Sequence, residues 1–316
     1  MNVLITRKIP GLAERILKDA GFKVYVNPKD GAMSEEEFLK RAKKADALIT
    51  LLSDKIDKEI IDQLERCRVI ANYAVGYNNI DVDYAKSKNI VVTNTPGILT
   101  DATADLAIAI MLACARNIIE ADKFMREDKF EGWKPKLYLG IELRGKTIGI
   151  IGAGRIGIET AKRAKSFGMK IVYFNSSKKD ALEKETGAKK VSLNYLMKNS
   201  DVISLHLPLT QKTFHLLDEE KLSLMKRDAI LVNTARGEIL DEKALIKILK
   251  RKKIFSAGFD VYENEPNINK ELLKLKNVVI LPHIGSATFE ARNKMAELSA
   301  RNVEKVLMGK KPLSGV

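Results

Sequence analysis

The chain has 316 residues, enough for two average domains that each bury their own core. Its 55 Lys and Arg outnumber its 41 Asp and Glu, which gives a formal net charge of +14. The basic residues are spread through helical stretches without interleaved aromatic residues, and the longest apolar run, Leu106–Ala115, is half a membrane span. These features argue against nucleic-acid and membrane partners, and the positive field favours small anions.

The two cysteines, Cys67 and Cys114, lie 47 positions apart inside apolar segments. We expect both to be buried thiols in a reducing compartment, because no metal-ligand spacing surrounds them. No signal peptide is visible at the N-terminus. The sequence therefore predicts a cytoplasmic protein without a bound metal.

The first third of the chain alternates short apolar strands with amphipathic helices. One helix is expected over residues 34–43, with Ser34 as its N-cap. Strands separated by helices pair in parallel through right-handed crossovers, so this region predicts a doubly wound α/β domain. The expected strands are Val3–Ile5, Phe22–Val26, Ala47–Thr50, Val69–Asn72 and Ile90–Thr93.

A second series of strands follows the turn at Asn94–Gly97 and a long helix from about Asp101. A final helix is expected over Ala287–Met308, with Gly309 as its C-cap. The two series predict two doubly wound parallel-sheet domains with a binding cleft between them. The strands of the second series are Thr147–Ile151, Lys170–Phe174, Val202–Leu205, Ile230–Asn233, Ser256–Phe259 and Val278–Leu281.

A glycine-rich loop joins the first strand of this second series to a helix. Its sequence is Gly152-Ala153-Gly154-Arg155-Ile156-Gly157. The three glycines permit a tight turn, a close backbone approach to a pyrophosphate, and close packing of helix on strand, in that order. The free N–H groups of the helix favour phosphate. The strand–loop–helix context predicts a dinucleotide site, and the alternative is a glycine-rich turn without a ligand.

Three further segments each follow a strand of the second series, where ligands of open α/β sheets bind. They are Asn233–Glu238, Asp260–Pro266 and Leu281–Thr288. Together with the glycine loop, they resemble the D-2-hydroxyacid dehydrogenase family over essentially the whole chain. Within that family, Leu51–Asp57 and Ala74–Asp81 look most like glyoxylate/hydroxypyruvate reductases.

This resemblance implies a Rossmann-type cofactor domain over residues 99–286. It also implies a flavodoxin-like substrate domain made of residues 1–98 and 287–316, with the chain crossing between domains near residues 98 and 286. The family is usually dimeric, and the apolar helix Asp105–Ala115 is the expected part of a homodimer interface.

Three side chains in the strand-end segments suit the reduction of a small 2-keto acid to its D-2-hydroxy acid. Arg236 can pair with the substrate carboxylate and polarise the carbonyl group. His283 is the best proton donor, because imidazole titrates near neutral pH. Glu265 would hydrogen-bond the far ring nitrogen and favour the imidazolium. The alternatives are a surface ion pair for Arg236 and a loop charge for Glu265.

The other two histidines receive structural interpretations. His206 lies on an apolar strand and is expected in the core. His215 falls in a polar connection with no nearby partner segment.

By the same resemblance, the N–H groups of Val75 and Gly76 grip the substrate carboxylate, together with Arg236 and His283, and Leu51 lines the pocket. Asp260 contacts the nicotinamide carboxamide, or alternatively caps a loop. The remaining residues assigned to the cofactor, beyond the glycine loop, are Asn175, Ser176, Ser177, Thr234, Ala235, Arg236, His283 and Gly285.

The cofactor preference is predicted from the end of the second strand of the cofactor domain. NAD-specific domains place Asp or Glu there, whereas this chain has Asn175. Ser176 and Ser177 could bind a 2′-phosphate, and Lys178 or Lys179 could neutralise it. NADPH is therefore expected to be preferred, with NAD possible; an exposed polar turn that accepts either cofactor is the alternative.

Two other functions are alternatives to the reduction of glyoxylate or hydroxypyruvate. A 3-phosphoglycerate dehydrogenase would need a further cation in the substrate pocket, and Leu51–Asp54 supplies none. A dinucleotide-sensing corepressor would need a peptide-binding surface or disordered extensions, and none is visible.

Overall fold

The computed structural model describes residues 1–29 and 31–316, and these form two compact units. We call Met1–Leu99 with Ser286–Val316 the split unit, and Thr100–Gly285 the central unit. Each observed boundary lies one residue from the expected one. The two crossings of the chain therefore fall next to residues 98 and 286.

The split unit contains a five-stranded parallel sheet in the order β2-β1-β3-β4-β5. This is the flavodoxin-like order, and its topological switch point lies between β1 and β3. The strands are β1 (Asn2–Ile5), β2 (Lys23–Val26), β3 (Ala47–Thr50), β4 (Val69–Asn72) and β5 (Val91–Thr93), and the helices are α1 (Ala13–Asp19), α2 (Glu35–Ala42), α3 (Lys58–Ile61), α4 (Val82–Ser87) and α12 (Phe289–Leu307).

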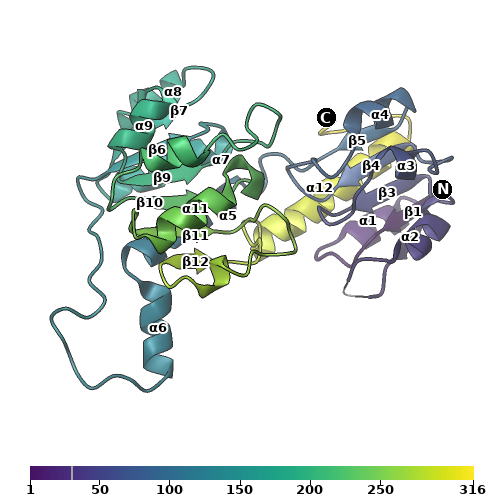
Figure 1. The fold of residues 1–316 in the computed structure, drawn as a ribbon. Helices are drawn as coiled ribbons and strands as arrows, with labels where there is room; N and C mark the ends of the chain where they lie inside the picture. Colours follow the sequence, from purple (N-terminus) through teal and green to yellow (C-terminus); the bar gives the residue numbers. More distant parts are fainter. Residues whose placement is uncertain (30) are drawn as a thin grey trace. The chain divides into compact units, whose positions relative to one another are not determined.

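The C-terminal helix α12 packs on α1, β3 and β4 of the split unit (Figure 1). Its N-cap is Thr288, whose Oγ1 accepts a hydrogen bond from Ala291 N–H. At the other end, Gly309 has a φ of +74° and so occupies the left-handed position that follows the helix. The Arg68 guanidinium beside β4 donates to the last carbonyls of α12. These contacts join the end of the chain to the N-terminal sheet.

The central unit contains a seven-stranded parallel sheet in the order β12-β11-β10-β9-β6-β7-β8. Six of these strands follow the Rossmann order 3-2-1-4-5-6, with the switch point between β6 and β9. Its strands are β6 (Thr147–Ile151), β7 (Lys170–Phe174), β8 (Lys189–Lys190), β9 (Val202–Leu205), β10 (Ile230–Asn233), β11 (Ser256–Phe259) and β12 (Val278–Ile280), and its helices are α5 (Thr100–Ala115), α6 (Ile118–Arg126), α7 (Arg155–Ser166), α8 (Asp180–Thr186), α9 (Leu193–Asn199), α10 (Glu219–Ser223) and α11 (Glu242–Lys250).

Helix α5 lies on one face of the central sheet and is largely buried there. At Gly258 in β11, an added Cβ would overlap Ile110 of α5, so the glycine permits this close approach. Cys114 lies in the same contact and is buried, as is Cys67 in the split unit. The expectation that Asp105–Ala115 is part of a dimer interface stays a prediction, but most of its apolar side chains are buried in their own unit. They are apolar because they form the core of their own unit.

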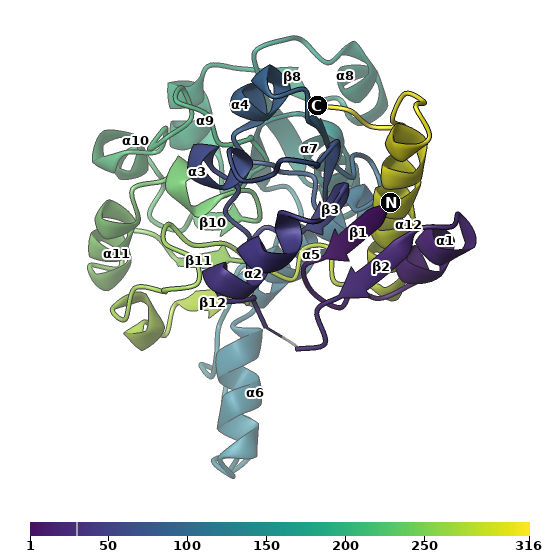
Figure 2. The same cartoon turned by 90° about the vertical axis from the view of Figure 1, so that its right-hand side faces the viewer.

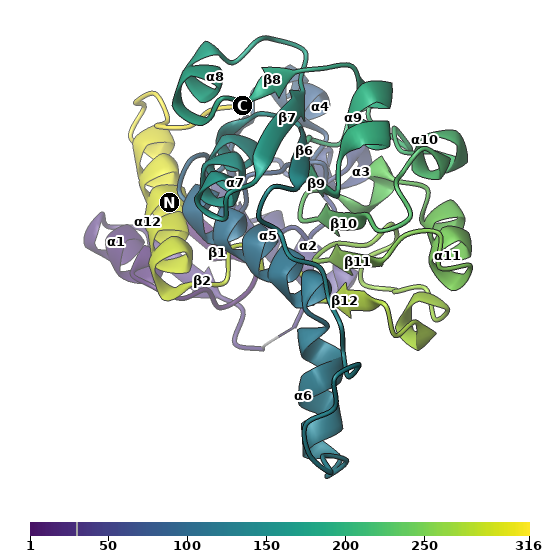
Figure 3. The same cartoon turned by 90° about the vertical axis from the view of Figure 1, so that its left-hand side faces the viewer.

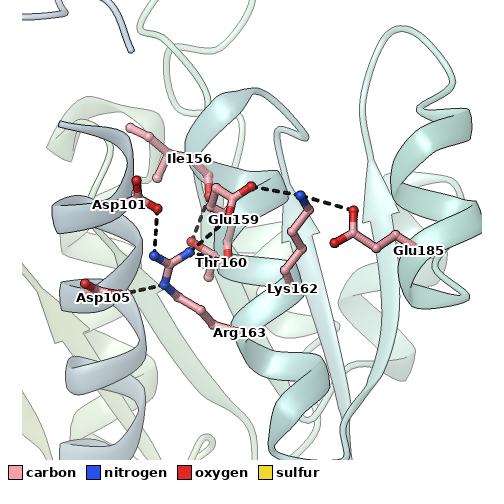
Figure 4. A network of polar contacts seen from close by, with 8 residues as sticks. All are labelled: Asp101, Asp105, Ile156, Glu159, Thr160, Lys162, Arg163 and Glu185. Carbon is pink, nitrogen blue, oxygen red and sulfur yellow. Dashed lines mark hydrogen bonds and ion pairs between the residues drawn. The ribbon is translucent and has the colours of Figure 1, made fainter. Parts of the chain in front are cut away.

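Arg163 of α7 fastens the helix that follows the glycine loop to α5 (Figure 4). Its guanidinium contacts Asp101 at 2.8 Å, Asp105 at 2.6 Å and Glu159 at 3.1 Å. Three carboxylates around one guanidinium form a network, which holds α7 more firmly than an isolated surface pair would.

Helix α6 stands away from the central sheet in all three views (Figures 1, 2 and 3), and none of its residues is buried. Across the described ranges, no single helix has the length and apolar character needed to cross a membrane. The pair α5 and α6 passes by length and composition, but it bends by 66°, and α5 is largely buried.

Candidate active site

The glycine loop after β6 has the backbone that a dinucleotide needs. Gly152 has a φ of +97°, and a Cβ there would lie 2.7 Å from the carbonyl carbon of His206. A Cβ at Gly157 would overlap the carbonyl oxygen of Gly152, so α7 can lie this close only with glycine at that position. Gly154 faces open space, and no side chain caps the N-terminus of α7. The loop therefore fits a pyrophosphate at the helix N-terminus.

His206, expected in the core, follows β9 beside this loop and is only half-buried. Its Nε2 lies 2.9 Å from Ser204 Oγ. Burial of the ring lowers the pKa of His206 to about 3, so its side chain is neutral at physiological pH.

Asn175 follows β7, and its side chain already has local partners. Its Oδ1 accepts from the N–H of Ala153 in the glycine loop at 3.2 Å, and its Nδ2 donates to Ser177. Asn175 thus connects the two parts of the predicted cofactor site, instead of offering a free amide.

The cations near Asn175 differ from the expected pair. Lys178 is held by Asp180 and Glu183, so its charge is compensated. Lys190 of β8 donates to the carbonyl of Ser176 at 3.1 Å. The sequence pattern did not indicate Lys190, because it lies in a two-residue strand of exposed lysines.

The turn after β10 fixes the position of Arg236. The side chain of the buried Asn233 accepts from Ala235 N–H at 3.0 Å and donates to the Arg236 carbonyl at 2.8 Å. Within this turn, the buried Thr234 Oγ1 has no hydrogen-bond partner in the structure. A buried hydroxyl without a partner costs free energy unless a ligand satisfies it, so Thr234 suits the assigned cofactor contact.

Arg236 is half-buried, and its Nη1 donates to the Ala235 carbonyl at 2.6 Å. Burial lowers the pKa of Arg236, whereas the charges of Glu265 and Glu238 act in the opposite direction. No acidic side chain within residues 1–29 and 31–316 forms an ion pair with it, and a surface ion pair therefore does not explain this arginine. A half-buried guanidinium of this kind suits an anionic ligand.

His283 and Glu265 form the hydrogen bond that the sequence predicted. Nδ1 of His283 lies 2.7 Å from Oε2 of Glu265, and about a third of each side chain is exposed. Glu265 Oε1 accepts from the N–H of Tyr262 at 3.0 Å, which fixes the carboxylate. Nε2 of the ring is left as the atom that can exchange a proton with a ligand.

The pKa of Glu265 is below its ordinary value. Burial alone would raise this pKa, but the hydrogen bond and charge of His283, the Tyr262 N–H and the charge of Arg236 together outweigh burial. The carboxylate is therefore ionised at neutral pH. It stabilises positive charge on the ring that it orients.

Gly237 brings the arginine turn against the glutamate loop. A Cβ at Gly237 would overlap the backbone of Tyr262 and Glu263, so only glycine permits this contact. Arg236 belongs to one of the two segments that meet here and Glu265 to the other, and each lies within a few residues of the contact along the chain. Local packing thus fixes the two charged groups relative to each other.

Asp260 has the contacts of the loop-capping alternative. Its two carboxylate oxygens accept from the N–H groups of Ile284 and Gly285, both at 2.7 Å. Burial raises the pKa of Asp260, and the two N–H donors and the charge of His283 oppose that effect. Asp260 therefore fixes the segment that carries His283.

His215 has no partner segment nearby along the sequence, but the structure supplies a distant partner. Its Nε2 lies 2.9 Å from Glu263 Oε1, and its ring stacks on Phe214 with centroids 4.1 Å apart. Glu263 is 48 residues away in sequence, which is why the local pattern could not reveal the pair.

Leu51, Val75 and Gly76 follow the adjacent strands β3 and β4 of the split unit. The side chain of Asn72 donates to the Gly76 carbonyl at 2.8 Å, and Asn79 donates to the carbonyls of Leu51 and Asp54 at 3.0 and 2.9 Å. A further hydrogen bond joins Asn72 to Asn79. The two loops therefore form one hydrogen-bonded edge, and sequence reasoning missed both asparagines that make it.

The end of β1 joins the same edge. Asp54 Oδ2 accepts from Thr6 Oγ1 and from Leu51 N–H. Nη2 of Arg7 lies 3.3 Å from Ser53 Oγ. Leu51–Asp54 itself contains no cation, as the sequence indicated, but Arg7 reaches this loop from a distant part of the sequence.

Nowhere in the part of the chain that the structure describes do three or more His, Cys, Asp or Glu side chains gather in a way that could hold a metal ion.

Comparisons with known proteins identify relatives of the chain. Residues 108–285 match the family model described as D-isomer specific 2-hydroxyacid dehydrogenase, NAD binding domain. The chain is 50% identical over 316 residues to a protein of Thermococcus litoralis named glyoxylate reductase, covering 98% of this chain and 95% of the relative.

Two solved structures show the same fold over the full chain. A protein of Thermus thermophilus is 43% identical, with a TM-score of 0.94 and 100% coverage of both chains. The NADPH-dependent glyoxylate/hydroxypyruvate reductase of Sinorhizobium meliloti, solved with NADP and malonate, is 31% identical, with a TM-score of 0.86 and coverage of 100% of this chain and 96% of that one. With a family model over more than half of its length and a full-length relative at 50% identity, the chain belongs to the D-isomer specific 2-hydroxyacid dehydrogenases.

Proposed function

We propose that this enzyme reduces glyoxylate and hydroxypyruvate to the corresponding D-2-hydroxy acids, using NADPH in preference to NADH. The observation that carries the proposal is the 2.7 Å hydrogen bond between His283 and Glu265 on the sheet edge that also bears Arg236. An oriented acid and a half-buried cation beside a dinucleotide loop are what the reduction of a 2-keto acid requires.

The cofactor, when bound, supplies the hydride. Thr234 and the open N-terminus of α7 are the groups that suit it, as argued above. Asp260 keeps the His283 segment in place through the backbone of Ile284 and Gly285.

Arg236 pairs with the substrate carboxylate and polarises the carbonyl group toward negative charge on oxygen. His283 donates its Nε2 proton to that oxygen as the charge develops. Glu265 remains ionised, holds Nδ1 through its short hydrogen bond and stabilises the imidazolium before transfer. In the reverse direction, the neutral ring accepts the proton of the hydroxyl group.

The substrate assignment rests on relatives and on the edge of the split unit. The relatives of Thermococcus litoralis and Sinorhizobium meliloti are named for glyoxylate and for glyoxylate with hydroxypyruvate, and malonate is bound in the second. The N–H groups of Val75 and Gly76 suit the substrate carboxylate, and Leu51 lines the space for a small substituent. Asn72 and Asn79 hold both loops in register.

The preference for NADPH is supported by a neutral Asn175 where NAD-specific domains carry an acid. Ser176 and Ser177 offer exposed hydroxyl groups for the 2′-phosphate. Lys179 and Lys190 are the cations that suit it, because Lys178 is neutralised by its two carboxylates.

A homodimer is supported by α6 and the segment after it. An apolar surface that the rest of its own unit does not cover marks an interaction site. In a symmetric dimer, this segment of each copy would be covered by the other copy. Light scattering on W133E is expected to detect monomers where the unsubstituted chain gives dimers. The large apolar side chains exposed on α6 and the segment after it include Ile118, Ile119, Met125, Phe130, Trp133 and Leu139.

A cytoplasmic location is supported by the two cysteines. Cys67 and Cys114 are free and buried, and burial raises the pKa of each thiol to about 12. Buried protonated thiols suit a reducing compartment.

The decisive experiment measures oxidation of NADPH and NADH with glyoxylate, hydroxypyruvate, pyruvate and phosphohydroxypyruvate side by side. We expect the highest kcat/KM for glyoxylate or hydroxypyruvate with NADPH. A higher kcat/KM with pyruvate would reject the substrate assignment, and a higher value with NADH would reject the cofactor assignment.

A further inference from the structure

Arg7 lies at the switch point of the split unit's sheet. It follows β1 directly, and this sheet has its switch point between β1 and β3. Arg7 is half-buried, and it makes no ion pair with any acidic side chain of residues 1–29 and 31–316. Its Nε is buried and has no hydrogen-bond partner.

The contacts of Arg7 do not explain its presence as a structural residue. Its one described side-chain hydrogen bond is the 3.3 Å contact from Nη2 to Ser53 Oγ, which is long for such a bond. No ion pair joins Arg7 to Asp54 among the described residues, and the Asp54 carboxylate instead accepts from Thr6 Oγ1 and the N–H of Leu51. A guanidinium with five donors that leaves a buried Nε unsatisfied is costly unless an anion completes its coordination.

In the order of strands, Leu51 after β3 lies between Arg7 after β1 and the loop after β4. Neighbouring strands in a sheet lie about 4.8 Å apart, so the ends of β4 and β1 are roughly 10 Å apart with the end of β3 between them. Under the proposed function, the substrate carboxylate lies at Val75 and Gly76, and its substituent extends over Leu51. The substituent then points toward Arg7.

We infer that Arg7 binds an oxyanion at the far end of the substrate. The enzyme therefore also reduces 2-keto acids that carry a second carboxylate or a phosphate, in addition to glyoxylate and hydroxypyruvate. This inference rests on the proposed function for the orientation of the substrate. Arg7 is a specificity-determining residue, and the hydride and proton transfers are unchanged.

The kinetic test compares R7Q with the unsubstituted enzyme on two matched substrate pairs. Oxaloacetate against 2-ketobutyrate reports the second carboxylate, and phosphohydroxypyruvate against hydroxypyruvate reports the phosphate. In each pair, the value of kcat/KM for the charged substrate is divided by the value for the uncharged substrate. Loss of one charge-assisted contact is expected to lower this ratio by about 10- to 100-fold. The pair that loses more identifies which anion Arg7 prefers.

Lys8 provides the matched control, because it is the next residue, is exposed and carries the same charge. K8Q is expected to leave both ratios within about twofold, since exposed charges are screened. Equal losses in R7Q for charged and uncharged substrates would assign Arg7 a structural role and overturn the inference. R7K, which keeps the charge but loses the planar fork, is expected to fall between R7Q and the unsubstituted enzyme.

A binding measurement separates this inference from the proposed function. Isothermal titration of the NADPH-saturated enzyme with D-malate and with D-2-hydroxybutyrate involves no turnover, because cofactor and ligand are then both in the reduced state. We expect tighter binding of malate in the unsubstituted enzyme and loss of that difference in R7Q. Equal affinities in the unsubstituted enzyme would reject the role of Arg7, whereas absence of glyoxylate reduction would reject the proposed function alone.

Discussion

The two sheet edges that carry the candidate site residues use different chemistry. On the central unit, Arg236, Glu265 and His283 are charged or titratable, and each alters the electrostatic environment of another. On the split unit, the loops are held by the neutral amides of Asn72 and Asn79.

This difference indicates that one edge carries out proton transfer and the other binds the substrate carboxylate. Proton transfer needs groups whose charge changes during the reaction, and those groups need partners that respond to the change. Binding of a carboxylate by backbone N–H groups needs fixed geometry, and the amides of Asn72 and Asn79 supply it without adding charge of their own. Loss of a central-edge side chain should therefore reduce turnover, whereas loss of a split-edge side chain should raise KM.

The largest expected effect is that of H283A. Removal of the proton donor should lower kcat for glyoxylate reduction by about 10²–10⁴-fold, because that is the usual contribution of a positioned acid. Steady-state assays at saturating NADPH measure it. H215Q is the matched control: His215 pairs with Glu263 and lies outside the proposed catalytic set, so its kcat should stay within about threefold. Similar losses in both variants would contradict the assignment.

E265Q should change the pH profile more than the maximal rate. Glu265 has a depressed pKa, so its carboxylate is ionised from acidic to alkaline pH and stabilises the imidazolium. Without that charge, the alkaline limb of kcat/KM for reduction should move to lower pH, by roughly one unit for about 1.4 kcal/mol of lost interaction.

The same depressed pKa has a consequence for stability. A carboxyl group with a folded pKa below its unfolded value stabilises the fold above the unfolded pKa and loses that contribution as pH falls through the folded one. E265Q should therefore lose stability near neutral pH and little in strong acid.

E263Q, in the same loop, is the control for the activity measurement, and its pH profile of kcat/KM should match that of the unsubstituted enzyme. An unshifted pH profile of kcat/KM in E265Q would argue that Glu265 does not act on the proton donor.

N79A tests the edge of the split unit. The substitution removes the donor to the carbonyls of Leu51 and Asp54, and leaving such groups unpaired costs about 1–3 kcal/mol. We expect KM for glyoxylate to rise about tenfold and kcat to fall less than KM rises. Q63A removes an amide from the surface of the same unit and should change neither value. A larger loss in kcat than in KM would contradict the proposed division between the two edges.

The smallest effect is expected for N175D. An aspartate can still accept from Ala153 N–H, but its charge repels a 2′-phosphate, so the ratio of kcat/KM for NADPH over NADH should fall about tenfold. N199D introduces the same charge at the end of α9 and should leave the ratio unchanged. An unchanged ratio in N175D would show that Asn175 does not set the preference.

The sequence determined most of the fold because strands and cofactor loop depend on local patterns. The apolar runs predicted eleven of the twelve described strands, with ends that differ by at most one residue. The glycine loop was recognisable because turn, phosphate approach and helix packing each require glycine at a fixed spacing. The exception, β8, has two exposed lysines and no apolar pattern.

The candidate catalytic set was also predictable, since each residue follows a strand and the carboxyl ends of parallel strands share one edge. Only the tertiary structure showed that α5 is apolar because it is buried and that α6 stands away from the sheet. It alone paired His215 with Glu263 and brought Arg7 to the loop after β3. These two contacts join residues 48 and 46 positions apart, and such pairing depends on how the strands are ordered in each sheet, which no local pattern encodes.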